Sequence, residues 1–451
     1  MCRFNGELLC KNLFIDLRNP CLLSRRALSH GERQWAKTMA IINLRGQEFT
    51  EREKRNLSIL DIVRRFGPIT RPEISRVLGL NIVTVSNYIE EFINKNLVFE
   101  KEFDVSEGGR RPVLLDINPD SGVVIGVGVN LLNIVGALVD LKGRIITRSV
   151  LERKGMGIKD VINCIIEIIT QTLNKAHDTH PKIKGIGVGI AGIVNKKDGA
   201  IRWPEKVGSG YDYASIYVPL KNIIEKEFGF PVIIENDATA ACFGEQWLDL
   251  EPSIKNLIYM FSGVGCGIMI NGEIYTGTTG SAGEVSIYNP KEETPFICQA
   301  GNPCFLKRWE IDFGMAREAR MRISQFADSS AVGKRILELA GNNLDAIHVK
   351  HIFQAAKEND ILAVELLDKA AKQLGIKVAY LVNLLNPEVV VIGGGLEEAG
   401  EVFLNTVRTV VKEWAFEEMA ANVKLVYSSL GENAVSLGAA SLVMRQVFSQ
   451  I

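Results

Sequence analysis

From residue 120 to the C-terminus, runs of β-branched residues and glycine alternate with stretches of helical periodicity, and this alternation strongly constrains the fold. Strands that alternate with helices bury their apolar side chains when helices are layered on a sheet, so the pattern predicts an α/β architecture. Two glycine-rich stretches that resemble each other suggest two similar halves. The predicted elements are hairpins at Val123–Ile146 and Leu257–Ile274, helices at Ile158–Ala176, Leu220–Phe228 and Ala363–Asn386, and strands at Ile183–Gly189, Val232–Glu235 and Val389–Gly395.

The bulk properties fit several domains in one chain. At 451 residues the chain is too long for one ordinary core, so we expect two or three domains. Its formal net charge of -1 gives no overall attraction to nucleic acid, so any such contact must come from local basic groups. Eight cysteines spread over this length do not resemble a disulfide framework, and no secretory signal is evident, so we expect a cytoplasmic protein.

Two segments need a separate interpretation. Residues 122–139 are nearly uncharged and long enough to cross a bilayer, but glycine and asparagine interrupt their β-branched runs, which favours a hairpin and no membrane association. Residues 1–45 have no clear period. Two explanations of them stay open, an N-terminal extension without fixed structure or a true start at Met39.

Residues 46–115 carry the signals of a winged helix-turn-helix. The predicted helices cover Glu51–Phe66, Thr70–Leu78 and Asn81–Asn94. Thr70 and Glu73 form a capping box with a proline in the first turn, and Gly79 provides the tight turn between the second and third helices. The segment Gly108–Pro112 is interpreted as the tip of a wing.

In a helix-turn-helix the second helix of the pair enters the major groove, so its outward polar side chains are candidates for contacts with DNA. Arginines of the preceding helix and of the wing are candidates for contacts with the phosphates and the minor groove. The alternative is an ordinary helical hairpin with a glycine turn, since acidic residues offset the basic ones in this region. The candidate DNA-binding residues are Arg71, Arg76, Asn81, Thr84, Ser86, Asn87, Arg110 and Arg111.

Several motifs occur together in the body: Pro231–Ala241, Gly263–Gly267, Asn271-Gly272, Ala282-Gly-Glu284 and Leu385–Gly395. With this combination the chain from about residue 50 to 451 resembles the ROK family of repressors and sugar kinases, and in particular its branch of xylose and N-acetylglucosamine repressors. The resemblance implies an actin-like ATPase body of two α/β lobes with a sugar cleft between them. It places the first lobe at residues 120–240, completed by a C-terminal helix at about 435–451, and the second at residues 241–434.

The resemblance also implies a ligand site. Asp237 matches the family's catalytic base, and Asn236 and Glu284 match its sugar-hydroxyl ligands. In a kinase, a carboxylate near the acceptor hydroxyl takes up its proton while other polar groups hold the remaining hydroxyls. For Asp237 the alternative is a helix N-cap that follows a strand.

The phosphate-binding positions depart from the family pattern. Family kinases carry an Asp followed by Gly-Gly-Thr in the first hairpin, where this chain has Gly128–Leu132, and the leucines at 131 and 132 fill space that phosphate needs. The second loop keeps Gly263, Gly265 and Gly267, although a tight β-turn needs the same residues. We therefore expect Asp237 to be a vestigial base in a protein that is not an enzyme and does not use ATP.

The zinc site that the resemblance implies is incomplete. Ile287 and Ala300 stand at two of the four ligand positions, and only Cys298 and Cys304 remain. Two thiolates do not complete a tetrahedral structural site, so we expect no metal. Leu306 stands where the family has a sugar-binding Glu, which removes a hydroxyl partner.

We therefore expect a sugar-responsive transcriptional regulator, repressor in type, that binds operator DNA as a homodimer or homotetramer and senses a sugar or sugar derivative between its lobes. The first alternative is an active ATP-dependent sugar kinase with an attached DNA-binding domain, which Asp237 favours. The second is a regulator whose body serves only for oligomerisation or docking, which Ile287 and Leu306 favour.

Overall fold

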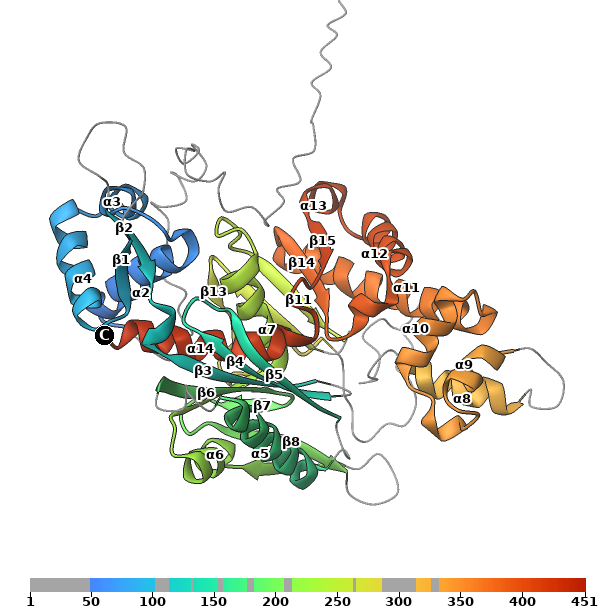
Figure 1. Cartoon of the computed structure of the whole chain (residues 1–451). Helices are drawn as coiled ribbons and strands as arrows, with labels where there is room; N and C mark the ends of the chain where they lie inside the picture. Colours follow the sequence, from blue (N-terminus) through green and yellow to red (C-terminus); the bar gives the residue numbers. More distant parts are fainter. Residues whose placement is uncertain are drawn as a thin grey trace, which may run out of the picture.

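The computed structural model describes residues 49–101, 113–130, 133–152, 157–176, 182–206, 213–262, 265–285, 314–325 and 332–451, without the side chains of 204–206 and 213–215. Two large mixed sheets form the body, and the N-terminal elements, drawn in blue, form a small unit at one end of it (Figure 1). Within the described residues no helix is both long and apolar enough to cross a membrane.

The N-terminal unit, which we define as residues 49–101 and 113–117, has three helices followed by two antiparallel strands. The predicted capping box of Thr70 and Glu73 is present, and Thr50 and Glu53 form another one at the preceding helix. A backbone bridge joins Ile69 to the second strand. The elements are α2 (Glu51–Phe66), α3 (Arg71–Leu78), α4 (Ile82–Asn94), β1 (Val98–Lys101) and β2 (Leu114–Ile117).

The first large sheet has the strand order β10-β6-β3-β4-β5, with β10, β6 and β3 parallel. The helices α5 and α6 cover the face of this sheet that points away from the second sheet. The segment 122–139 forms strands, as predicted, but the expected hairpin is part of a meander of three strands. The elements are β3 (Val123–Val129), β4 (Asn133–Asp140), β5 (Ile145–Glu152), α5 (Ile158–Lys175), β6 (Ile183–Ile190), α6 (Leu220–Phe228) and β10 (Val232–Asn236).

A three-stranded antiparallel sheet that the sequence analysis did not predict lies beside the first lobe's core. Ile201, Trp203 and Val218 of this sheet are buried in the same apolar cluster as β3 and α5. Its strands are β7 (Ile193–Asn195), β8 (Ala200–Lys206) and β9 (Tyr213–Val218).

The second large sheet has the strand order β13-β12-β11-β14-β15, with β11, β14 and β15 parallel. The predicted hairpin over Leu257–Ile274 is again a three-stranded meander. The strands are β11 (Leu257–Phe261), β12 (Gly265–Ile270), β13 (Glu273–Ile274), β14 (Val389–Gly393) and β15 (Lys424–Tyr427). Between β13 and β14 lie the helices α8 (Met315–Gln325), α9 (Lys334–Leu339), α10 (Val349–Lys357) and α11 (Ile361–Leu385), and between β14 and β15 lie α12 (Glu401–Trp414) and α13 (Glu417–Asn422).

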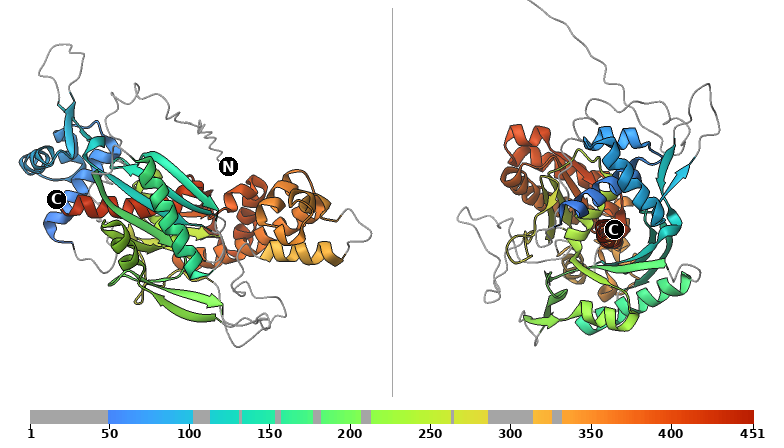
Figure 2. Two further views of the ribbon diagram at one scale, coloured as in Figure 1. Left: turned by 60° about the horizontal axis from the view of Figure 1, so that its bottom comes forward. Right: turned by 90° about the vertical axis from the view of Figure 1, so that its left-hand side faces the viewer.

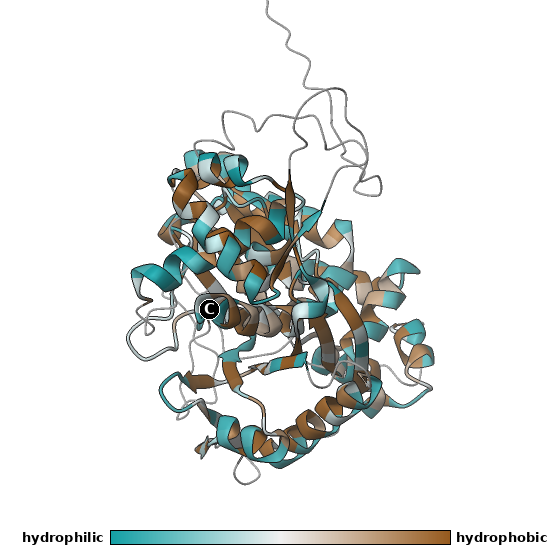
Figure 3. Cartoon of the chain, turned by 60° about the vertical axis from the view of Figure 1, so that its left-hand side comes forward, coloured by the Kyte–Doolittle hydropathy of each residue, from teal (hydrophilic) through white to brown (hydrophobic). Residues whose placement is uncertain are grey.

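Two central helices, α7 (Asp237–Gly244) and α14 (Ala434–Ser449), lie between the two large sheets. α14 packs on β3 and β6, α7 packs on β11 and β12, and the two helices contact each other. The right-hand view of Figure 2 shows α14 end-on in the middle of the molecule, and Figure 3, coloured by hydropathy, shows apolar residues along this helix. In β14 successive residues bury opposite faces, since Val391 joins the cluster around α7 and α14 and Ile392 joins the cluster around α11.

Glycines on β3 and β6 allow α14 to lie directly on the first sheet. A Cβ atom at Gly126 would lie 2.0 Å from the carbonyl oxygen of Ser436, and one at Gly187 would lie 2.1 Å from that of Ala439. The glycine content of these strands is therefore explained by close packing of backbones rather than by ligand binding.

Candidate ligand site and nucleic-acid interface

Asn236 and Asp237 lie at the N-terminus of α7, and a backbone bridge places Glu284 beside the strand that packs near this end of the helix. β10 ends at Asn236, which is the N-cap of α7, and Asp237 is the first residue of the helix. Gly265 at the start of β12 forms a backbone bridge with Glu284, and a Cβ atom at Gly265 would lie 4.0 Å from the Cβ of Ala238. Segments far apart in the sequence therefore reach the same end of one helix.

The side chain of Asn236 is held from two sides. Its Oδ1 accepts a hydrogen bond from the backbone N–H of Thr239 at 3.2 Å, and its Nδ2 donates to the carbonyl of Gly192 at 3.3 Å. These bonds fix the side chain without using the full hydrogen-bonding capacity of an amide. Because Asn236 is the cap of α7, the explanation of Asp237 as an N-cap is wrong.

Asp237 and Glu284 differ in their environments. Asp237 is buried, with 8% of its surface exposed, and its Oδ1 accepts a hydrogen bond from the N–H of Ala238 at 2.8 Å. Glu284 is exposed, yet the surrounding protein desolvates its carboxylate enough to raise its pKa. The oxygens of a carboxylate accept hydrogen bonds, so Glu284 is suited to accept one from a sugar hydroxyl.

The glycines of the predicted second phosphate loop have separate roles. A Cβ atom at Gly267 would lie 2.3 Å from the carbonyl oxygen of Ala238, so this glycine allows β12 to pack on α7. Gly265 faces more open space. Gly263 lies outside the described residues, as do Leu131 and Leu132 of the first hairpin, and the predictions made for these three stay predictions.

A pocket with about 590 Å³ of empty space, part of it open to solvent, lies between the β3–β4 turn, α10 and the start of α14. Tyr259, Phe261 and Phe353 contribute aromatic rings to its lining, and the charged lining residues are Lys350, Glu398 and Glu432. Asn236, Asp237 and Glu284 do not line it, so the pocket and the candidate sugar residues are different places. The lining has one basic and two acidic residues, so it offers no excess positive charge that would attract the phosphate groups of a nucleotide.

The β3–β4 turn is tied to the turn before α14, η8 (Gly431–Asn433). Asn130 Nδ2 donates to the carbonyl of Glu432 at 3.2 Å, and Asn133 Nδ2 donates to the Glu432 carboxylate at 3.0 Å. Arg148 forms an ion pair with the same carboxylate. The side-chain amides of Asn130 and Asn133 therefore donate to Glu432 of the same chain rather than into the pocket.

The positions of the incomplete zinc site, Ile287, Cys298 and Cys304, and the substituted sugar position Leu306 all lie outside the described residues. Among the residues that are described, no group of three or more His, Cys, Asp or Glu side chains is arranged to hold a metal ion. The absence of a metal therefore stays a prediction from the sequence.

α3 and α4 are joined by three residues, and Gly79 in this turn has a φ of 64°, a left-handed conformation that glycine adopts at little cost. α4 buries Val85, Ile89 and Phe92. The predicted DNA-contacting residues Asn81 and Asn87 are exposed, and Thr84 and Ser86 are half-buried. Asn81 also caps α4, because its Oδ1 accepts a hydrogen bond from the N–H of Val83 at 2.8 Å.

The candidate arginines have different surroundings. Arg71 forms an ion pair with Glu100 of β1 at 2.7 Å, so contact with a phosphate would compete with an internal partner. Arg76 is exposed. Arg110, Arg111 and the rest of the predicted wing tip, Gly108–Pro112, lie outside the described residues.

The residues that join the N-terminal unit to the body were not predicted from the sequence. Arg64 and Arg65 of α2 donate to the carbonyls of Trp247 and Gln246, which are 183 and 181 residues away. The only local signal is an Arg-Arg pair that follows Asp61 at helical spacing, and no local pattern identifies the distant carbonyls.

Comparison with known proteins identifies the family of this chain. The chain is 32% identical to a xylose repressor of Caldicellulosiruptor bescii over 394 residues, which cover 84% of this chain and 93% of that protein. It is 30% identical to a glucokinase of Halalkalibacterium halodurans over 325 residues, which cover 71% of this chain and 95% of that enzyme.

The fold matches that of a solved ROK family transcriptional regulator, a homolog of the E. coli MLC protein, with a TM-score of 0.67 and 21% identity over 88% of this chain and 97% of that one. The body also matches the fold of a solved ROK family glucokinase from Streptomyces griseus, with a TM-score of 0.59 and 25% identity over 71% of this chain and 99% of that one. The model of the ROK family matches residues 124–446, and the chain belongs to this family.

Proposed function

We propose that this protein is a sugar-responsive transcriptional repressor whose N-terminal unit is a winged helix-turn-helix that binds operator DNA. The observation that carries the proposal is the attachment of a ROK body to a helix–turn–helix–strand unit in which Asn81, the cap of α4, and Asn87, in the middle of α4, are exposed. The similarity to the xylose repressor, which extends over 84% of the chain, supports it and makes D-xylose the first effector to test.

In this proposal Asn236, Asp237 and Glu284 hold sugar hydroxyls at the N-terminus of α7. The body does not transfer phosphate, because the β3–β4 turn bonds to Glu432 and the pocket beside it lacks excess positive charge. The domains are residues 46–115, residues 120–240 with 435–451, and residues 241–434. Two copies of the unit, in a homodimer or homotetramer, bind paired half-sites.

The test uses the full chain and a DNA sequence that it selects from a random library. We expect D-xylose to change the dissociation constant of this complex, and Asp237→Asn to weaken D-xylose binding while DNA binding without sugar is retained. Glu227→Gln, an exposed carboxylate of α6, is the control. Failure to select any sequence above non-specific binding would contradict the proposal.

A sugar kinase is the second candidate, favoured by the position of Asp237 at the start of α7 and by the similarity to the glucokinase. An assay of ADP release with ATP, Mg²⁺ and either D-xylose or D-glucose decides between the two. We expect no turnover above that of the Asp237→Asn variant. Turnover that depends on Asp237 would establish catalysis.

A further inference from the structure

Both central helices end at the N-terminal unit, and they begin at two different places, α7 at the candidate sugar residues and α14 at the pocket. α7 begins at Asp237 and continues without interruption into a π-helix, η4 (Glu245–Asp249), that ends beside α2. α14 begins with Ala434 in the lining of the pocket and ends where Asn56 Nδ2 of α2 donates to the carbonyl of Ser449 at 3.3 Å. Figure 1 shows the C-terminal end of α14 beside α2.

The contact between α2 and the end of η4 is a buried polar joint. Arg64 donates to the carbonyl of Trp247 at 2.7 Å, and Arg65 donates to the carbonyl of Gln246 at 3.1 Å. Asp61 binds both arginines, at 2.7 Å and 2.9 Å. The exposed fractions of these three side chains are 4%, 10% and 6% for Arg64, Arg65 and Asp61.

The joint satisfies groups that would otherwise be unfavourable inside the protein. The last carbonyls of a helix have no partner within it and carry partial negative charge, which the two guanidinium groups complement. Burial alone would raise the pKa of Asp61, but Arg65 and Arg64 hold it below its ordinary value. The Arg64 guanidinium also lies 4.8 Å from the ring centroid of Trp247. Removing one member leaves buried polar groups without partners, so the geometry of the joint is strongly specified.

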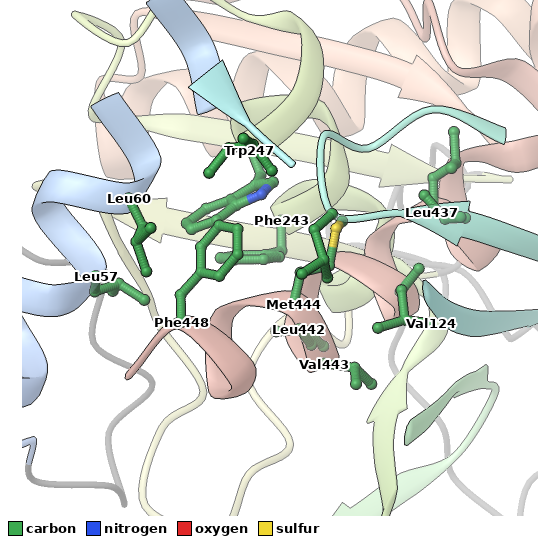
Figure 4. Packing of buried hydrophobic residues seen from close by; sticks show 14 of the residues in the cluster. Leu57, Leu60, Val124, Phe243, Trp247, Leu437, Leu442, Val443, Met444 and Phe448 are labelled. Atoms are coloured by element: carbon green, nitrogen blue, oxygen red, sulfur yellow. The ribbon is translucent and has the colours of Figure 1, made fainter. Parts of the chain in front are cut away.

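The two central helices are in direct backbone contact, which makes them one mechanical unit. A Cβ atom at Gly244 would lie 2.8 Å from the Cα of Gly438, and one at Gly438 would lie 1.8 Å from the carbonyl oxygen of Ala240. Around this crossing Phe243 stacks on Trp247 with ring centroids 5.2 Å apart, and Figure 4 shows both with Phe448 of α14 beside α2. Such packing leaves little space to absorb a shift at one end of α7.

We propose that Arg64 and Arg65, which Asp61 holds in place and which bind the carbonyls of Trp247 and Gln246, couple the ligand state at the N-terminus of α7 to the orientation of the DNA-binding helices. This inference rests on the proposed function and adds the residues through which the sugar acts. A ligand that binds Asn236 and Asp237 differently in two lobe arrangements moves α7, and the joint transfers this movement to α2. Arg64 and Arg65 are thus positioning residues for operator binding.

The experiment compares Arg65→Met with Arg55→Met. Methionine keeps much of the apolar stem of Arg65 and leaves the Arg64–Asp61 pair in place, whereas Arg55 is an exposed residue of the same helix and controls for the lost charge. The measured quantity is the ratio of operator dissociation constants with and without saturating D-xylose. Functional coupling of this kind amounts to roughly 5- to 150-fold.

We expect the ratio to fall toward one in Arg65→Met and to keep its wild-type value in Arg55→Met. The D-xylose affinity of the DNA-free protein, measured by calorimetry, should stay within about twofold in both variants, which a general loss of structure would not allow. An unchanged ratio in folded Arg65→Met would overturn the inference while leaving the proposed function intact. A wild-type ratio of one would overturn the proposed function, and the joint's role with it.

A measurement on the wild-type protein covers the case in which Arg65→Met does not fold. We expect D-xylose to change the hydrogen exchange of backbone amides in the second half of α2, around Asp61–Phe66, as well as near Asp237. Protection confined to the surroundings of Asp237 would contradict the coupling.

Discussion

Glu245 is a carboxylate buried where η4 meets the end of the second sheet. Ser428 and Ser429 donate hydroxyl hydrogen bonds to it, and the N–H of Leu430 donates at 3.4 Å. Burial nevertheless dominates and raises the pKa of Glu245 above its ordinary value of 4.5, and the nearby Asp249 adds to the rise. A carboxyl group with a raised pKa in the folded state favours folding at low pH, and this contribution is lost as the pH rises through the folded-state pKa.

Substitution of Glu245 tests this environment. We predict that Glu245→Gln removes part of the loss of stability that occurs as the pH rises above the ordinary glutamate pKa of 4.5, because glutamine carries no charge to bury. Urea unfolding at several pH values measures it, with Glu227→Gln, an exposed site, as control. If the difference in unfolding free energy between Glu245→Gln and the wild type were the same at every pH, the raised pKa of Glu245 would be refuted.

At the residue scale, the role of a side chain can be predicted from the sequence when its partners are neighbours along the chain. It cannot be predicted when the partners are distant in the sequence. The capping box of Thr70 and Glu73 is a local signal and is present. Asp237 was correctly placed at a strand-to-helix transition, but the adjacent Asn236 takes the cap, since one residue decides which side chain reaches the free amides. The partners of Arg64 come from folding of the whole chain.

The position of α14 depends on glycines of the sheet beneath it. We predict that Gly126→Ala lowers the free energy of unfolding by about 1–3 kcal/mol, because the new methyl group would overlap the carbonyl of Ser436. Gly265→Ala, where the nearest atom is 4.0 Å away, should have a smaller effect. Denaturant unfolding of the two variants gives the comparison, and equal effects would show that α14 adjusts to the extra atom.

Asn87, an exposed residue of α4, carries a prediction about DNA. If Asn87 contacts a base edge, Asn87→Ala should weaken binding to the selected operator by about 1–3 kcal/mol at fixed salt, with little effect on stability. Asn94 is an exposed residue of the same type at the C-terminal end of α4, so Asn94→Ala is the control. Fluorescence anisotropy gives both affinities, and an equal effect of the two substitutions would argue against insertion of the N-terminal end of α4.

At the element scale the sequence predicts long segments with strong periodicity. α2, α6 and the strand β10 fall within a residue or two of the predicted ranges. The strands β7, β8 and β9 were not predicted because they are short and only partly apolar, and the helices α8, α9 and α12 were not predicted at all. Each predicted hairpin has a third strand in the structure, because β5 pairs with β4 and β13 pairs with β12. Neither of these third strands was predicted as a separate element.

On the scale of the whole molecule, the proposed division into domains meets one complication. α7 spans residues 237–244, so a boundary at 240/241 passes through a helix that packs on the second sheet and on α14. The sequence indicates that two sheets with helices are present. It does not indicate that two helices lie between the sheets, because that arrangement depends on glycines in β3, β6 and α14 that meet only in the folded chain.

The most direct test of the central claim is the affinity of the full chain for its selected operator as a function of D-xylose concentration, at one fixed salt concentration. We predict sequence-specific binding and a change of at least about fivefold in the dissociation constant at saturating sugar. Binding that is indifferent to DNA sequence, or a specific complex whose affinity no pentose or hexose changes, would contradict the account.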